Sequence, residues 1–458
     1  MEFEQKYQQT LDYLYSFVDF SLVRNLRYSP EKFDLSRMVD FANALGNPQD
    51  SYPVIHVAGT KGKGSVSALC ANSLKAAGYK VGLYTSPHLI DFNERLQVNG
   101  VSISHADLID LVEANKSVIE SIPELTTFEI TTGLAFLYFQ QQGVDVGVIE
   151  VGLGGRLDPT NVVKPLVSVI TSISYDHTKI LGETLAEIAT EKAGIVKPGV
   201  PLVLSPQKDE ARLVIERIAE QRRAPLVQVG KDYLYTPISR SLTGQSFLVW
   251  TAGEQEQINA IIDSGDGEEW EAHRYTIPLL GHHQVENAAT AYTALQVARQ
   301  AGLKINESAI HSGFSDVFWP GRFEILQSEP PLILDSAHNR DSALKLRLTL
   351  DDYFPGLPVI MVFGASEDKD LNGMFAELLP RVQQVIATQS YHPRAIEPEQ
   401  LVGLAHQFGC PAFAVPTVEE ALMEANRLVE EGGVILVTGS IFVVAGIREA
   451  WFHKQSTL

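Results

Sequence analysis

Short runs of apolar, β-branched residues alternate with stretches of helical periodicity along most of the chain. The first series predicts strands at Val54–Ala58, Val81–Thr85, Val146–Val151, Val167–Ile173 and Val200–Leu204. Runs that are apolar nearly throughout are typical of strands buried on both faces. Since helical patterns separate these runs, we expect a parallel sheet with helices on both sides.

The same alternation returns in the last third of the chain. Strands are predicted at Leu332–Asp335, Pro358–Phe363, Val385–Thr388 and Val434–Thr438, with helices near 371–381, 397–408 and 417–431. Gly313, Pro320 and Gly321 mark a boundary between the two series. The prediction is an α/β protein with a first domain over 1–312, a hinge over 313–321 and a second α/β domain over 322–458.

Residues 230–280 interrupt the rhythm. Ser246–Thr251 and Arg274–Leu279 alternate between apolar and polar positions and flank the acidic loop Asp263–Glu269. Alternation with a period of two predicts strands with one solvated face, so we expect a small antiparallel insertion here.

Composition favours a soluble enzyme over a membrane or nucleic-acid-binding protein. Hydrophobic residues make up 45% of the 458 residues and charged residues 20%, and no apolar run reaches the length of about 18 residues that a membrane helix needs. A net charge of −20 disfavours a nucleic-acid surface. With two cysteines and an acidic start that does not resemble a leader peptide, a reducing cytoplasm is expected.

A glycine-rich loop follows the first predicted strand. It reads Gly59-Thr-Lys-Gly-Lys-Gly-Ser65 and leads into a helical pattern. Glycines let backbone N–H groups approach phosphates, a lysine reaches the outer phosphates, and the helix N-terminus favours negative charge. The first spacer is shorter than in the common phosphate-binding loop and Gly64 separates Lys63 from Ser65, so a glycine turn without function is the alternative.

Three further polar residues follow predicted strands: Ser86, Glu150 and His177. The carboxyl ends of parallel strands meet at one edge of a sheet, where ligands bind. A hydroxyl and a buried carboxylate suit Mg²⁺, and His177 is a less common ligand. The alternatives are a Ser-Pro turn at Ser86, an ion pair of Glu150 with Arg156, and a structural role for His177.

Later segments carry polar residues with equally plausible structural roles. Lys192 lies near a predicted helix end, where the helix dipole favours a lysine. Asn287 offers an amide suited to an adenine edge, and Arg322 near the boundary could contact phosphate. Asp335 and His338 follow the first strand of the second series. The structural alternatives for the last three segments are, in order, a helix cap, a surface ion pair and a polar loop.

Taken in order, these segments resemble the Mur ligase superfamily, and most closely its folylpolyglutamate synthase/dihydrofolate synthase branch. The resemblance rests on His56–Ser65, Thr85–His88, Val148–Asp158, Asp176–Gly182, Glu191–Gly199, Gly281–Ala288, Pro320–Glu324 and Asp335–Asn339. It implies a P-loop ATPase-like first domain, a Rossmann-like second domain and ATP-dependent amide ligation. Lys61 stands where many relatives have asparagine, and Ser336 where glycine is commoner.

The resemblance also implies roles for individual residues. ATP would be held by Gly62, Lys63, Gly64, Ser65, Asn287, Arg322, Asp335 and His338. Two magnesium ions would be held by Ser86, Glu150, His177 and a carbamylated Lys192, with Lys63, Lys192 and His177 serving catalysis. A pterin or folate would lie near Asp19, Thr126, Leu157, Asp158 and Pro159.

Three functions remain at this stage. The first joins L-glutamate to a folate carboxylate through an acyl phosphate, in a monomer without nucleic-acid or membrane partners. The second is a peptidoglycan-type Mur ligase that acts on a nucleotide sugar. The third is a nucleotide-binding switch without ligation, which leaves the second α/β domain and Lys192 unexplained.

Overall fold

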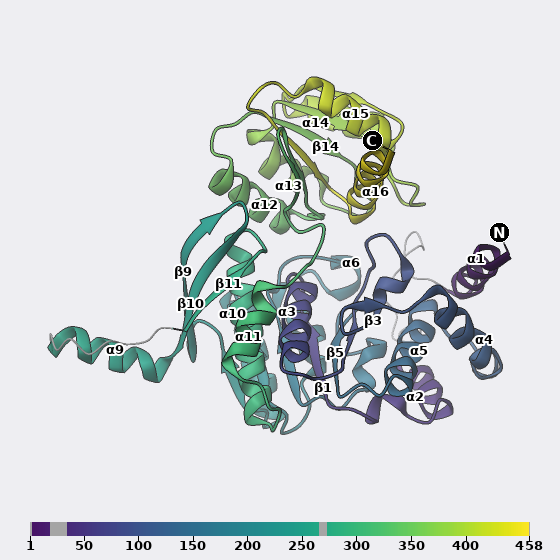
Figure 1. Ribbon diagram of the computed structural model, residues 1–458, viewed down its shortest axis with the longest axis vertical. Helices are drawn as coiled ribbons and strands as arrows, with labels where there is room; N and C mark the ends of the chain where they lie inside the picture. Colours follow the sequence, from purple (N-terminus) through teal and green to yellow (C-terminus); the bar gives the residue numbers. More distant parts are fainter. Residues whose placement is uncertain (1, 19–33, 265–272, 458) are drawn as a thin grey trace.

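The amino-terminal domain is built on an eight-stranded sheet with strand order β4-β3-β2-β5-β1-β6-β7-β8. Figure 1 shows the computed structural model, which describes residues 2–18, 34–264 and 273–457. The strands are β1 (Val54–Ala58), β2 (Val81–Tyr84), β3 (Leu96–Val98), β4 (Val101–Ser102), β5 (Val146–Glu150), β6 (Val167–Ile170), β7 (Leu202–Leu204) and β8 (Leu226–Gln228). All neighbours are parallel except the β2–β3 and β3–β4 pairs. The five strands predicted in this region are confirmed; β3, β4 and β8 were not predicted.

Helices cover both faces of this sheet, as the continuous apolar strands predict. They are α1 (Glu2–Tyr15), α2 (Leu35–Ala44), α3 (Lys63–Ala76), α4 (His105–Ser121), α5 (Thr127–Gln141), α6 (Thr178–Leu181), α7 (Leu185–Lys192), α8 (Asp209–Gln221), α10 (His282–Gln300) and α11 (Glu307–Ser315). On one face, Ile55 and Val57 pack with α3, α10 and α11. On the other, Val54 packs with α1, α2, α4 and α5, and Ala58 with α7 and α8.

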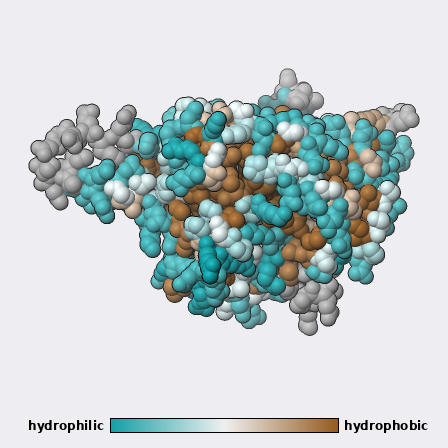
Figure 2. Space-filling view, turned by 90° about the horizontal axis from the view of Figure 1, so that it is seen from below, coloured by the Kyte–Doolittle hydropathy of each residue, from teal (hydrophilic) through white to brown (hydrophobic). Residues whose placement is uncertain are grey.

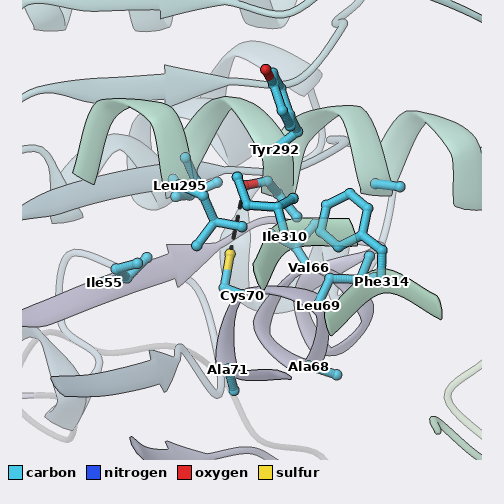
Figure 3. Close-up of a cluster of buried hydrophobic side chains, with 14 of the residues drawn as sticks. Ile55, Val66, Ala68, Leu69, Cys70, Ala71, Tyr292, Leu295, Ile310 and Phe314 are labelled. Carbon is cyan, nitrogen blue, oxygen red and sulfur yellow. Dashed lines mark hydrogen bonds between the residues drawn. The ribbon is translucent and has the colours of Figure 1, made fainter. Parts of the chain in front are cut away.

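The core around α3 positions the glycine loop. Val66, Leu69 and Cys70 on α3 face Leu295 of α10 and Phe314 of α11 (Figure 3). These side chains are fully buried, and burying a large apolar side chain contributes about 1.5–3 kcal/mol. Such packing fixes the N-terminus of α3 relative to the sheet.

The predicted antiparallel insertion is confirmed. Its strands are β9 (Tyr233–Ser241), β10 (Gly244–Thr251) and β11 (His273–Ile277), with order β11-β10-β9. Helix α9 (Ala252–Ser264), which was not predicted, extends away from the body of the molecule (Figure 1).

The carboxy-terminal domain has a six-stranded sheet with order β12-β13-β17-β14-β15-β16. Its strands are β12 (Glu324–Ser328), β13 (Pro331–Leu334), β14 (Val359–Phe363), β15 (Gln384–Ala387), β16 (Ala412–Ala414) and β17 (Val434–Thr438). Its helices are α12 (Arg340–Tyr353), α13 (Leu371–Leu378), α14 (Pro398–Gln407), α15 (Val418–Leu428) and α16 (Ile441–Thr457). The predicted strands and helices are confirmed, but the unpredicted edge strand β12 is antiparallel to β13, which makes the sheet mixed.

A leucine of the amino-terminal domain enters the core of the other domain. Leu89, in the loop after β2, is 9% exposed and packs with Leu332, Val443 and Val444. The boundary between the two domains therefore includes side chains from both.

The face of the amino-terminal domain that points away from this boundary shows apolar patches between polar side chains (Figure 2).

Candidate active site

A cavity of about 210 Å³ lies where the two domains meet. The carboxyl ends of β1, β5 and β13, the end of α7 and the first turns of α10 contribute to its wall. It is lined by twelve of the predicted site residues: Gly62, Lys63, Gly64, Ser65, Ser86, Glu150, His177, Lys192, Asn287, Arg322, Asp335 and His338. Residues that are far apart in sequence thus share one small site.

The glycine loop presents a bare helix N-terminus to this cavity. Gly62 precedes α3 with φ +90° and makes no side-chain cap, so the first N–H groups of α3 remain available. A Cβ atom on Gly62 would lie 2.2 Å from Oδ1 of Asn287. The backbone angle strains any residue other than glycine here, and a Cβ would in addition have to displace the amide of Asn287.

Glu150 ends β5 as a buried carboxylate with few partners. Its side chain accepts the backbone N–H of Ser86 at 3.3 Å and lies 3.9 Å from Nζ of Lys63. Burial raises the pKa of Glu150 to about 7, although the charge of Lys63 acts in the opposite direction. The alternative ion pair with Arg156 is wrong, because Arg156 pairs with Glu191 at 2.9 Å.

Lys192 ends α7, but its amine points into the cavity. Nζ donates to the carbonyl oxygen of Gly59 at 2.9 Å, and the residue is 4% exposed. Burial, followed by the charge of Lys63, lowers the pKa of Lys192 to about 7. A lysine that served only the helix dipole would keep its amine in water, so the structure gives this side chain a place in the site.

Asp176 joins the two domains through charged contacts. Its carboxylate lies 3.0 Å from Nζ of Lys61 and 3.7 Å from Nζ of Lys369, and it accepts from Nδ2 of Asn339 at 3.1 Å. Nζ of Lys61 is also 2.8 Å from Nε2 of His338. Burial alone would raise the pKa of Asp176, but the charge of Lys61 and the hydrogen bond with His338 hold it well below its ordinary value. The extra charge of Lys61 is therefore engaged between the domains.

His177 occupies the rim of the cavity. It precedes α6 in the left-handed region with φ 49°, and its side chain is 39% exposed. Nε2 lies 3.8 Å from the carboxylate of Asp176. The residue borders both the small cavity and the wider cleft beside it.

Asp335 and Arg322 bring the carboxy-terminal domain to the site. Asp335 follows β13 and accepts the backbone N–H groups of Phe323 and Ala337, both at 2.9 Å. Burial raises the pKa of Asp335 to about 6 and lowers that of Arg322. On the opposite wall, Asn287 donates from Nδ2 to Gln284 at 2.9 Å.

A wider cleft of about 1,690 Å³ adjoins the small cavity. Thr126, Leu157, Asp158 and Pro159 line it, whereas Asp19 lies outside the described residues. Thr126 caps α5, and the carboxylate of Asp158 accepts from the backbone of Leu153 at 2.8 Å and of Thr160 at 3.0 Å. Asp158 thus shapes the loop that borders the cleft.

Sequence reasoning did not single out Asp176 or Lys369. Asp176 stands beside His177 shortly after a predicted strand, so the strand-end rule could have identified it. Lys369 carried no comparable signal, because only the tertiary structure brings it to Asp176.

Comparison with known proteins identifies relatives over the whole length. The chain matches the models for the Mur ligase middle domain over residues 57–295 and the Mur ligase glutamate ligase domain over 321–441. It is 36% identical over 422 residues to the dihydrofolate synthase/folylpolyglutamate synthase of Bacillus subtilis, which covers 91% of this chain and 94% of that protein.

Two solved structures have the same fold across nearly the full chain. Folylpolyglutamate synthase of Mycobacterium tuberculosis complexed with ADP superimposes with a TM-score of 0.85 at 29% identity, covering 98% of this chain and 99% of the other. E. coli FolC in complex with DHPP and ADP gives 0.82 at 31% identity and covers 98% of each chain.

Proposed function

Because the chain belongs to the Mur ligase family, in its folylpolyglutamate synthase/dihydrofolate synthase branch, we propose that it joins L-glutamate to a folate carboxylate at the expense of ATP. The acceptor is dihydropteroate, a folyl-glutamate or both. The products are the amide, ADP and phosphate.

The convergence of the glycine loop, Glu150, Lys192 and Arg322 on one cavity carries this proposal. The bare N-terminus of α3 and the cation of Lys63 suit a triphosphate. Asn287, beside Gly62, is positioned for the nucleotide, and Asp335 and His338 approach from the other domain. The wider cleft that opens from this cavity has room for the acceptor and the amino acid.

The reaction proceeds in two steps. A carboxylate oxygen of the acceptor attacks the γ-phosphorus of ATP, and the bond from this phosphorus to the bridging β-phosphate oxygen breaks. The products of this step are ADP and an acyl phosphate of the acceptor. The amine of L-glutamate then attacks the acyl carbon, phosphate leaves and the nitrogen loses a proton. Lys63 and Arg322 offset the charge of the transferring phosphoryl group. Closure of the domains about the proposed hinge over 313–321 excludes water, which would hydrolyse the acyl phosphate.

The residues around Glu150 fit magnesium. The carboxylate of Glu150 is buried, and within the described part of the chain it has one ion pair, at 3.9 Å from Lys63; Ser86 and His177 line the same cavity. Among the described residues no group of three or more His, Cys, Asp or Glu side chains is arranged to hold a metal. Mg²⁺ commonly takes one or two protein oxygens and completes its shell with waters and phosphates, so this donor set is adequate. When bound, magnesium would neutralise phosphate charge.

A carbamate on Lys192 would supply a carboxylate for a second magnesium. The lowered pKa of the amine favours this modification, because only a neutral amine attacks carbon dioxide. The unmodified amine would offer a metal ion no negatively charged oxygen.

The folate would lie along Thr126, Leu157, Asp158 and Pro159 in the wider cleft. We place the protein in the cytoplasm as a monomer, without nucleic-acid or membrane partners. In the part of the chain that the structure describes, no helix combines the length and apolarity needed to cross a membrane. Both cysteines are unpaired and buried, which agrees with a reducing compartment.

Phosphate release with Mg²⁺, ATP and L-glutamate tests the proposal, in parallel with dihydropteroate and with tetrahydrofolate. Release with both acceptors indicates a bifunctional enzyme, and release with one identifies the step. No release with either, together with turnover of a muramyl nucleotide or without an acceptor, would refute the folate assignment.

A further inference from the structure

Arg95 stands out among the arginines of the wider cleft because it pairs with no carboxylate of the described residues. It lies at the end of the loop between β2 and β3 and contributes to the cleft wall. The other cleft arginines pair as follows: Arg37 with Glu129 at 3.3 Å, Arg340 with Glu377 at 3.1 Å and Arg394 with Asp368 at 3.6 Å. The charge of Arg95 is therefore available to a ligand.

The acidic residues of the same loop are occupied elsewhere. Asp91 accepts from Tyr7 and is 2.9 Å from Nε2 of His105. Glu94 accepts three backbone N–H groups of its own loop, at 2.7, 3.0 and 2.9 Å. These bonds stiffen the loop and leave Arg95 without local neutralisation.

A neutral partner orients the guanidinium. Nε of Arg95 donates to Nδ1 of His88 at 3.0 Å, and the guanidinium carbon lies 5.1 Å from the centre of the Phe92 ring. Because arginine only donates, Nδ1 of His88 must accept. Neither terminal nitrogen of Arg95 donates a hydrogen bond to a described residue. The two donors that bind a carboxylate in bidentate fashion are therefore unused.

The backbone places Arg95 close to the proposed reaction centre. The carbonyl oxygen of Arg95 accepts the N–H of Thr85 at 3.2 Å, and the next residue, Ser86, donates its N–H to Glu150. Arg95 lines the wider cleft but not the small cavity. A carboxylate on Arg95 would thus sit beside the activated group without being the group that reacts.

We propose that Arg95 binds the non-reacting carboxylate of an acceptor that already carries a glutamyl residue. This inference rests on the proposed function. When the γ-carboxylate of such an acceptor is activated, its α-carboxylate remains free and needs a cation. Arg95 shares the amino-terminal wall of the cleft with Thr126 and Pro159, where we place the acceptor. Dihydropteroate has a single carboxylate, which reacts, so Arg95 favours glutamylated acceptors over it.

Steady-state kinetics of Arg95→Gln test this assignment. The KM for tetrahydrofolate should rise roughly tenfold to a hundredfold, the size expected for losing a charge-assisted bidentate contact. The KM values for L-glutamate, for ATP and for dihydropteroate, if it is turned over, should stay within about twofold of wild type. Arg95→Lys keeps the charge but loses the two parallel donors of the guanidinium, so its KM for tetrahydrofolate should lie between those of wild type and Arg95→Gln. Arg340→Gln is the matched control, because Arg340 lines the same cleft but pairs with Glu377.

The alternative outcomes are distinct. A raised KM for L-glutamate would assign Arg95 to the amino acid and overturn the inference. Unchanged constants, or an equal rise with both acceptors, would also overturn it. A wild-type protein that turns over neither acceptor refutes the proposed function itself, whereas failure of this inference leaves wild-type turnover intact. Unfolding temperatures of Arg95→Gln and Arg95→Lys verify that both variants fold.

Discussion

Replacing Lys192 by alanine should abolish most of the activity if the side chain is carbamylated. With a pKa of about 7, roughly three quarters of this amine is neutral near pH 7.5, against about one part in a thousand for an ordinary lysine. The cavity therefore raises the reactive fraction by nearly three orders of magnitude. Loss of a carboxylate that holds a metal beside the phosphates should lower kcat by roughly 100-fold or more.

Phosphate release in buffers with and without bicarbonate measures this effect. ¹³C-labelled bicarbonate should in addition give a carbamate signal in wild-type protein that is missing from Lys192→Ala. Lys197→Ala is a suitable control: burial lowers the pKa of Lys197 to about 8, but its amine donates to Asn161 outside the cavity. Full activity of Lys192→Ala, unaffected by bicarbonate, would refute the reasoning.

Three other changes test the site and its scaffold. Gly62→Ala should weaken ADP binding about tenfold or more in calorimetry, because φ +90° strains a side chain and a Cβ would displace Asn287 from the site. Gly143→Ala, with φ +63° and open space, is the control, and equal effects of the two variants would contradict this explanation. Glu150→Gln should raise the Mg²⁺ concentration for half-maximal phosphate release at least about tenfold, and an unchanged Mg²⁺ dependence would exclude Glu150 as a ligand. The same variant should not lower the unfolding temperature in EDTA, because burial already disfavours the charged carboxylate. Burial lowers the pKa of His56 to about 3, so between pH about 6.5 and 3 this imidazole is neutral in the folded protein and protonated in the unfolded chain. The free energy of unfolding should therefore fall by up to about 1.4 kcal/mol per pH unit as the pH drops through this range. His56→Gln should flatten this slope in urea titrations, and parallel slopes would contradict the assignment.

Much of the fold follows from the chain alone, because the buried strands carry an unmistakable apolar signal. Val54–Ala58 and Val434–Thr438 were predicted to the residue. The edge strand β12 was missed, since half-buried strands of mixed character lack a continuous apolar run. The strand-end rule brought Ser86 and Glu150 together correctly.

Other parts of the site depend on tertiary structure. Whether Lys192 caps a helix or enters a cavity is decided by where Gly59 lies, and these residues are 133 positions apart. That Arg95 has no carboxylate partner among the described residues could not be predicted from the sequence either, because Asp91 and Glu94 stand nearby and only the structure shows that they bond elsewhere.

The burial of Leu89 in the carboxy-terminal domain has a mechanical consequence. Leu89 lies three residues after Ser86, and the carboxylate of Glu94 accepts the backbone N–H groups of Leu89 and of the two residues that follow it. A displacement of the carboxy-terminal domain would either remove Leu89 from its buried position or move the loop that carries it. We therefore expect a change in the spacing between the domains to shift Ser86 relative to Glu150.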